Sequence, residues 1–232
     1  MGEVQIRPSN VADDKVVEVV VNRSEKLNAL DTLLIANIAK SFRYLRQDDE
    51  LRAVVLSGAG KAWVVGADIK EMATLDRHTA ATFISNLHDA MLSIRDLPVP
   101  VIAKVHGFAL GGGMELAAAC DLRIASDDAR FGMPEVHVGL PSVIEASLLP
   151  GLMGAGRAGR LMLTGEVIDA KRAFEWGFVE SSASVHIFNN SSMNPMKQPN
   201  QKSGSCKNKI DKLLNFPISI SQWLRNRKIK QP

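Results

Sequence analysis

The stretch His106-Gly107-Phe108-Ala109-Leu110-Gly111-Gly112-Gly113-Met114-Glu115 places three consecutive glycines between a β-branched segment and a segment of small residues. Glycine adopts backbone conformations that other residues avoid, and it has no side chain to block the approach of a ligand. The first N–H groups of a helix lack intrahelical partners and favour negative charge. The stretch therefore predicts a strand, a turn and a helix whose first N–H groups face a ligand. A tight packing turn without a ligand is the alternative.

Strand and helix patterns alternate on both sides of this turn. Runs of β-branched and apolar residues predict strands at 16–21, 51–56, 99–105 and 122–125. Helical spacing of apolar residues and capping residues predict helices at 32–46, 68–75, 78–95, 114–120, 143–152, 155–163 and 170–176. Such alternation is typical of an α/β protein with a layered core, which is the fold class we predict.

The charge of the chain is unevenly distributed along its 232 residues. Residues 1–180 carry a net charge of −5 and residues 181–232 a net charge of +8, within a total of +3. The second segment is also rich in Ser, Asn, Gln, Pro and Lys. We therefore predict a domain at 1–180 and an atypical, disordered basic tail at 181–232. The tail contains one Trp and no Tyr, so nucleic-acid binding is not expected.

Other features of the sequence limit the cellular environments in which the protein is expected. The two cysteines are far apart and show no metal-ligand spacing, so we expect a reduced, intracellular protein without a bound metal. The first residues do not read as a secretory signal, and charged residues interrupt every apolar run before it reaches membrane-spanning length. No contact with a membrane is expected.

A second turn, Gly66-Ala67-Asp68-Ile69-Lys70, also follows a strand and a loop of small residues and opens a helix. If the two turns meet in space, their N–H groups form an oxyanion hole for a carbonyl that gains negative charge. Asp68 is interpreted as the N-cap of its helix in preference to a catalytic group.

Two glutamates accompany these turns. Glu115 lies in the first turn of the helix after the glycines, and Glu135 follows Pro134 on a loop-like segment. Taken alone, each is explained as a solvated or capping residue. If both line one pocket, their titrations are coupled, and the pair can take a proton from water and return a proton to carbon. We therefore predict Glu115 and Glu135 as catalytic residues.

Five blocks of sequence resemble the crotonase (enoyl-CoA hydratase/isomerase) family in their residues, their order and their spacing. The blocks are Asn22-Arg23-Ser24-Glu25-Lys26-Leu27-Asn28-Ala29-Leu30, Gly66-Ala67-Asp68-Ile69-Lys70-Glu71, His106 to Leu116, Cys120-Asp121 and Phe131-Gly132-Met133-Pro134-Glu135-Val136. The resemblance covers about residues 16–180. It implies a ββα superhelical core that binds acyl-CoA thioesters, in a homotrimer or a hexamer made of two trimers.

The resemblance also implies roles for individual residues. Ala67 and Gly112 match the positions whose backbone N–H groups hold the thioester oxygen, and Glu115 and Glu135 match the two catalytic glutamates of the hydratases. The residues that the resemblance places near the substrate's CoA are Lys26, Leu27, Ala67, Asp68, Ile69, Lys70 and Gly112. Relatives that only shift a double bond commonly keep the second glutamate and lose the first.

The implied activity is hydration of a 2-enoyl-CoA to a 3-hydroxyacyl-CoA, in fatty-acid or secondary-metabolite acyl-CoA processing. No cofactor is implied, because CoA is part of the substrate. A 3-enoyl to 2-enoyl-CoA isomerase is the alternative within the family. The resemblance implies a peroxisomal location, although no C-terminal address is seen, and cytosol and mitochondrion remain alternatives.

Three departures from the family pattern qualify these expectations. Trp63-Val64-Val65 places bulk before the second glycine turn, and residues 139–146 replace the frequent Pro-Gly-Ala-Gly-Gly stretch with wording found in a subgroup that includes fungal relatives. The third departure is the basic tail, which stands where the family has C-terminal helices. A truncated, weakly active or inactive paralogue that binds CoA or a full-length partner is therefore a further alternative.

Overall fold

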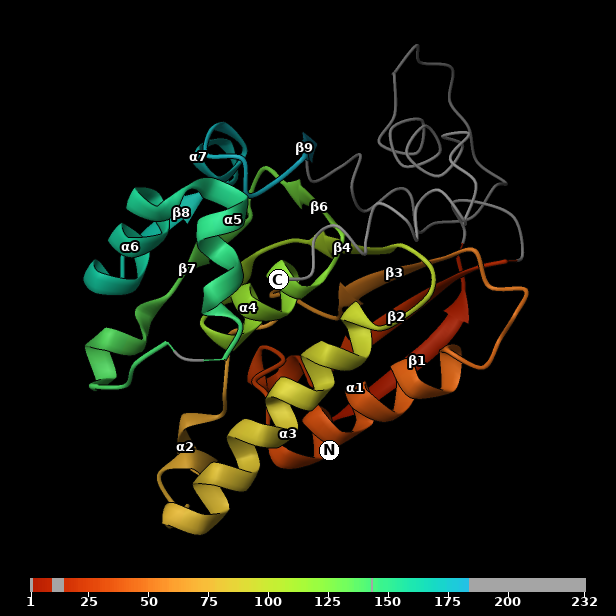
Figure 1. The fold of residues 1–232 in the computed structure, drawn as a ribbon, viewed down its shortest axis with the longest axis horizontal. Helices are drawn as coiled ribbons and strands as arrows, with labels where there is room; N and C mark the ends of the chain where they lie inside the picture. The colour runs from red at the N-terminus through yellow and green to blue at the C-terminus, as the bar shows by residue number, and fades with distance from the viewer. Residues whose placement is uncertain (1, 10–14, 143, 184–232) are drawn as a thin grey trace.

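The computed structural model describes residues 2–9, 15–142 and 144–183 of the chain. Its main sheet has six strands in the order β1-β2-β3-β4-β6-β9 (Figure 1). These strands are β1 (Glu3–Pro8), β2 (Val16–Asn22), β3 (Ala53–Gly58), β4 (Val101–Val105), β6 (Leu122–Ser126) and β9 (Ser181–Ala183). Strand β1 is antiparallel to β2, and every other pair in the sheet is parallel.

A second, smaller sheet has the order β5-β7-β8. Its strands are β5 (Phe108–Leu110), β7 (Arg130–Gly132) and β8 (Val167–Asp169). A parallel bridge between Val64 and Ala109 joins β5 to the segment that follows β3. The glycine turn therefore leaves the small sheet and not the main one.

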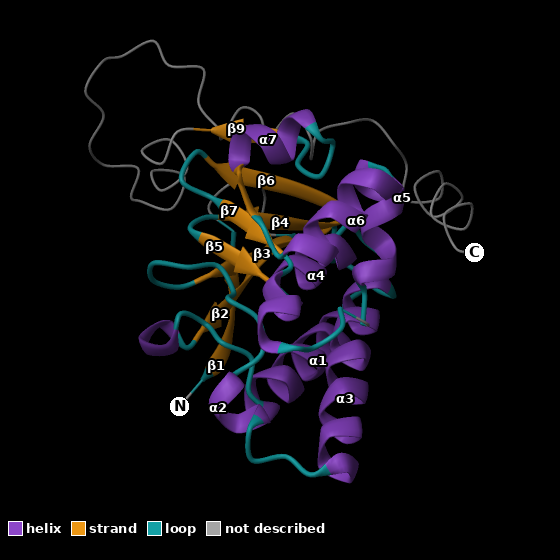
Figure 2. Cartoon of the chain, turned by 90° about the vertical axis from the view of Figure 1, so that its left-hand side faces the viewer, coloured by secondary structure: helices purple, strands orange, loops and turns teal. Residues whose placement is uncertain are grey.

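Helices cover one face of the main sheet, as Figure 2 shows for α1 (Thr32–Leu45), α3 (Arg77–Arg95) and α4 (Gly112–Ala119). The remaining α-helices are α2 (Ile69–Met72), α5 (Leu149–Met153), α6 (Ala155–Thr164) and α7 (Ala170–Glu175), and the 3₁₀ helices are η1 (Ser24–Lys26), η2 (Pro134–Val138) and η3 (Ala146–Leu148). Within the described ranges, no helix has both the length and the apolar character needed to cross a membrane.

Local sequence explains the principal elements. Strands β2, β3 and β4 are almost entirely buried, as expected for parallel strands, and their residues are mostly Val, Ile, Leu and Ala. Asp31 caps α1 by accepting a hydrogen bond from Leu34 N, and Asp76 forms a capping box with Thr79 at the start of α3. Helix α1 then buries one apolar stripe, comprising Leu34, Ile35, Ile38, Ala39, Phe42 and Leu45.

The α/β class is confirmed, as are the four predicted strands and most of the predicted helices, with boundaries shifted by one to three residues. The helical structure predicted at 143–152 is observed as η3 from Ala146 followed by α5 from Leu149, so it begins later than predicted. Strands β1, β5, β7, β8 and β9 were missed. Four of them have three residues each, too few to show an alternating pattern.

The predicted domain boundary at residue 180 lies before the end of the sheet. Strand β9 pairs with β6 in parallel, with Ser181 opposite Ile124, so the sheet extends at least to Ala183. The rest of the predicted tail, residues 184–232, lies outside the described residues.

Arg123 of β6 joins the end of the described chain to the core. Its side chain is 1% exposed and forms an ion pair with Glu180. Its Nε donates to Phe178 O, and its guanidinium also donates to Cys120 O at 2.9 Å. A buried arginine is tolerated because these acceptors satisfy it, and it holds the segment after α7 against β6.

Replacing Arg123 with Met is expected to destabilise the fold by roughly 2–4 kcal/mol, because buried carbonyl oxygens lose their donors and Glu180 loses its partner. Urea denaturation followed by circular dichroism measures this difference. Arg43→Met, at an exposed position of α1, is the matched control and should change stability by less than about 0.5 kcal/mol. Equal midpoints for Arg123→Met and the control would contradict the assigned role.

Candidate active site

The two glycine turns lie against each other. Gly66 has φ 94°, and a Cβ placed on it would lie 2.9 Å from Leu110 O and 3.5 Å from Gly112 N. Such distances leave no room for a side chain at Gly66, so the contact depends on glycine. The structure therefore brings together the two segments that the sequence analysis expected to meet.

Both N–H groups expected to form the oxyanion hole lack a partner among the described residues. Leu30 and Ala67 form a parallel bridge in which Leu30 N donates to Gly66 O and Asp68 N donates to Leu30 O, each at 2.8 Å. In a parallel bridge the N–H of the central residue points away from the partner strand, which leaves the Ala67 N–H unused. Gly112 is the first residue of α4, where N–H groups have no intrahelical acceptor.

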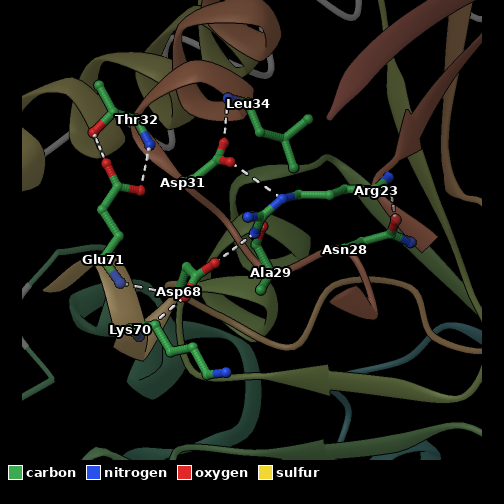
Figure 3. A network of polar contacts seen from close by, with 9 residues as sticks. All are labelled: Arg23, Asn28, Ala29, Asp31, Thr32, Leu34, Asp68, Lys70 and Glu71. Atoms are coloured by element: carbon green, nitrogen blue, oxygen red, sulfur yellow. Dashed lines mark hydrogen bonds and ion pairs between the residues drawn. The ribbon is translucent and has the colours of Figure 1, made fainter. Parts of the chain in front are cut away.

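An ion-pair network supports the Ala67 turn (Figure 3). The Arg23 guanidinium lies between two carboxylates, with Nη1 2.7 Å from Asp68 Oδ2 and Nε 3.1 Å from Asp31 Oδ2. The hydrogen bond from Arg23 lowers the pKa of the Asp68 carboxyl. Asp68 also caps α2 by accepting from Lys70 N, which confirms the capping interpretation.

Asn28 fixes the loop that carries Lys26 and Leu27. It is buried with φ 59°, and its Nδ2 donates to the carbonyl oxygens of Ala59, Ala62 and Trp63 at 2.8–3.0 Å. Lys26 ends η1, and both Lys26 and Leu27 are exposed. The loop thus presents a cation and an apolar side chain next to the Ala67 turn, to which Arg23 and Leu30 join it.

Glu115 is almost completely buried, with 2% of its surface exposed, in the first turn of α4. Its Oε1 accepts hydrogen bonds from Glu145 N at 3.0 Å and Ala146 N at 2.9 Å. Burial and, to a smaller extent, the charge of Glu135 raise the pKa of Glu115 to about 7, although these two amides oppose the shift. The carboxyl group therefore changes its charge close to neutral pH.

Glu135 lies at the start of η2, beside the glycine turn. A Cβ on Gly111 would lie 2.5 Å from Glu135 Oε1, so a side chain at that position would displace the carboxylate. The Ser142 hydroxyl donates to Glu135 Oε2 at 3.1 Å. Burial raises the pKa of Glu135, and the hydrogen bond from Ser142 opposes that shift.

The arrangement combines two functions in one place. Unpaired N–H groups from Ala67 and Gly112 can stabilise an oxygen that gains negative charge. Burial raises the pKa values of both glutamates, and the charge of Glu135 adds to the shift of Glu115, whose pKa of about 7 lets it hold or release a proton near neutral pH. In the part of the chain that the structure describes, no group of three or more His, Cys, Asp or Glu side chains could hold a metal ion.

The sequence analysis missed the residues that hold these carboxylates. Ser142 and the amides of Glu145 and Ala146 lie in the segment that was noted only as a departure from the family wording. A hydroxyl and two backbone amides carry no recognisable local signal, so only the folded chain could identify them. Trp63 lies in the hydrophobic core, fully buried, with its indole N–H donating to Leu56 O at 3.4 Å. The bulk of the Trp63 side chain is therefore accommodated in the hydrophobic core.

Comparisons with known proteins point to one family. A family model described as enoyl-CoA hydratase/isomerase matches residues 12–231. The short-chain-enoyl-CoA hydratase of Clostridium acetobutylicum is 35% identical over 211 residues, which is 90% of this chain and 76% of that protein. The crystal structure of an enoyl-CoA hydratase of Mycobacterium smegmatis matches with a TM-score of 0.84 and 30% identity, covering 99% of this chain and 84% of the other.

Some relatives are considerably longer than the region that matches. The mouse mitochondrial enoyl-CoA hydratase domain-containing protein 2 is 35% identical over 179 residues, which is 76% of this chain and only 60% of the mouse protein. The family match runs to residue 231, and so includes residues that the sequence analysis assigned to an atypical tail.

Replacing Glu115 with Gln is expected to stabilise the fold at pH 8 and to have little effect at pH 5. The folded pKa of about 7 exceeds the ordinary value of 4.5, so the folded state binds the proton more tightly than the unfolded state. Stability from this group is thus greatest at low pH and falls as the pH rises from about 4.5 to 7, with a total loss on the order of 2–3 kcal/mol. The neutral amide avoids this loss and can still accept the two backbone hydrogen bonds.

Thermal unfolding of both proteins at pH 5, 6, 7 and 8 measures this effect. The control is Glu50→Gln, which replaces an exposed carboxylate that is distant from Glu115 in the sequence. A stability difference between Glu115→Gln and the parent that does not vary with pH would show that Glu115 has an ordinary titration.

Proposed function

The chain belongs to the enoyl-CoA hydratase/isomerase family, and we propose that it adds water across the double bond of a 2-enoyl-CoA to form a 3-hydroxyacyl-CoA. The observation that carries this proposal is a buried glutamate, Glu115, and a half-buried one, Glu135, both with raised pKa values, next to two unpaired backbone N–H groups. Fatty-acid or secondary-metabolite acyl-CoA processing remains the proposed context.

In this proposal the thioester oxygen binds between the N–H groups of Ala67 and Gly112. Addition of water at C3 moves electron density through C2 and the carbonyl carbon to that oxygen, which becomes an enolate. Donors fixed before the reaction stabilise this charge without reorganising, and removing one such donor commonly slows a reaction about 10²–10³-fold. The rigid contact between Gly66 and the Leu110–Gly112 backbone supports this role.

The two glutamates act as one acid–base unit. One carboxylate takes a proton from water as the oxygen attacks C3, and a proton is returned to C2 from the pair, so the reaction adds one water and leaves the glutamates as they began. A close carboxyl pair holds a single proton most readily, because two negative charges repel each other. The proposed reaction requires no metal or cofactor, since CoA is part of the substrate.

The exposed loop and turn are proposed to bind the CoA portion. Lys26 and Lys70 are exposed cations that suit the phosphate groups of CoA, while Leu27 and Ile69 are 42% and 62% exposed and suit its apolar parts. Asp68 is proposed to act through its ion pair with Arg23, which fixes the turn. A homotrimer or hexamer, and a peroxisomal, mitochondrial or cytosolic location, remain predictions from the family resemblance.

Two alternatives follow from specific observations. A 3-enoyl to 2-enoyl-CoA isomerase needs one glutamate to move a proton between two carbons, and Glu135 has its own donor in Ser142. A weakly active or inactive paralogue that binds CoA or a full-length partner is suggested by the polar, basic composition of residues 181–232.

Glu135→Gln is expected to reduce hydration of crotonyl-CoA by roughly 10²–10⁴-fold without unfolding the protein, because an amide cannot act as a general base or general acid at neutral pH. Loss of the enoyl absorbance measures the reaction. The control is Glu50→Gln, an exposed glutamate that should retain parental turnover. Equal hydration by Glu135→Gln and the parent would refute the assignment of this residue.

The two family activities are separated by Glu115→Gln. For a hydratase, this substitution should reduce crotonyl-CoA hydration by at least about 10²-fold, because both carboxyl groups handle protons of the same water. For an isomerase, conversion of a 3-enoyl-CoA to its 2-enoyl isomer should persist in Glu115→Gln and disappear in Glu135→Gln. Parental protein that is folded and inert towards both substrates, and towards longer acyl chains, would favour the inactive paralogue.

A further inference from the structure

Glu145 carries a buried carboxylate that the proposed reaction does not use. Its side chain is 3% exposed, and an unpaired carboxylate at such a site is strongly unfavourable. Two side chains of α3 contact it: His88 Nδ1 lies 3.0 Å from Oε1, and Arg95 Nη1 lies 3.3 Å from Oε2. These contacts join the segment before η3 to the long surface helix.

The backbone of the same residue holds Glu115. Glu145 N and Ala146 N both donate to Glu115 Oε1, at 3.0 and 2.9 Å. Both bonds reach one oxygen, and the backbone of Ile144 adds a further hydrogen bond to the same carboxyl group. Because the side chain and the amide belong to one residue, fixing the carboxylate of Glu145 also fixes the direction of its N–H.

We propose that Glu145 is a positioning residue, which orients Glu115 through the 145–146 amides while its own carboxylate is anchored to α3 by Arg95 and His88. This inference rests on the proposed role of Glu115 in hydration. Glu145 lies next in sequence to the 3₁₀ turn that begins at Ala146, with φ −109° and ψ 13°, so its conformation is not maintained by a regular helix. The anchor on α3 supplies the missing restraint.

The inference predicts a particular pattern of defects. Without the anchor the two amides move away from Glu115, and the ionised carboxylate loses stabilising donors, which raises its pKa. The charged and titratable groups that face this site are Glu135 from η2 and His88 and Arg95 from α3. Substrate binding should change little, because among the described residues Glu145 forms no hydrogen bond or ion pair with the Ala67 turn or the Lys26 loop.

Glu145→Ala removes the anchor while retaining both backbone amides. We expect kcat to fall about tenfold with KM within about twofold of the parental value, and the acid limb of the kcat–pH profile to move upward by about one unit. Glu145→Gln keeps one acceptor for Arg95 and should give an intermediate result. Glu18→Ala is the matched control, because Glu18 is also a buried glutamate paired with an arginine, on β2.

Arg95→Gln removes the α3 partner of the Glu145 carboxylate, and so tests the same anchor even if Glu145→Ala does not fold. It should shift the acid limb in the same direction, and the double variant Arg95→Gln/Glu145→Ala should lose little beyond Glu145→Ala alone. Parental kcat and an unmoved acid limb in folded Arg95→Gln and Glu145→Gln would overturn the inference.

A titration that does not require activity separates this inference from the proposed function. The carboxyl ¹³C resonance of Glu115, assigned by its loss in Glu115→Gln, should titrate at higher pH in Glu145→Ala or Arg95→Gln than in the parent. An unchanged midpoint overturns the inference even in an active enzyme. If the midpoint shifts in these variants but the parent does not hydrate enoyl-CoA, the positioning role is supported and the hydratase proposal is refuted.

Discussion

The close approach of two backbone turns is the constraint on which the rest of the structure depends. A Cβ on Gly113 would lie 2.0 Å from Val64 O, and one on Gly66 would lie 2.9 Å from Leu110 O. No side chain fits at either contact, so the segment after β3 can pack against the start of α4 only through glycine. This contact brings the Ala67 turn against the start of α4, and the absence of a side chain at Gly111 leaves space for Glu135.

The carboxylates that this arrangement accommodates oppose the stability of the fold. Burial raises the pKa values of Glu115 and Glu135, which means that their charged forms are unfavourable where they lie. Residues 142–146 offset part of this cost with one hydroxyl and two amides. Such a compromise is common at sites of chemistry, where groups are held in states that water would not favour.

Two ion-pair clusters restrain the segments that carry this centre. Arg23 joins the Lys26 loop to the Ala67 turn through Asp31 and Asp68, and the pairing of Glu145 with α3 restrains the segment that holds Glu115. The side chains of the Arg23 cluster are 14–19% exposed and the Glu145 carboxylate is 3% exposed, whereas His88 is 49% exposed. Partly buried pairs are screened less than exposed pairs. The site is therefore positioned by residues that lie far from it in sequence.

The sequence by itself determined the α/β class, the family, the two glycine turns and the two glutamates, because each is written in local residue types and spacing. It also indicated Asp68 as a helix cap, since capping needs only neighbouring residues. Only the tertiary structure decided which groups hold Glu115 and Glu135, and that Trp63 fills the core. Short strands such as β5 and β7 were likewise invisible in the sequence. All of these features escaped the sequence for one physical reason. Backbone amides, three-residue strands and contacts between residues 30 or 50 positions apart leave no periodic pattern in the sequence. They form only when the chain has packed.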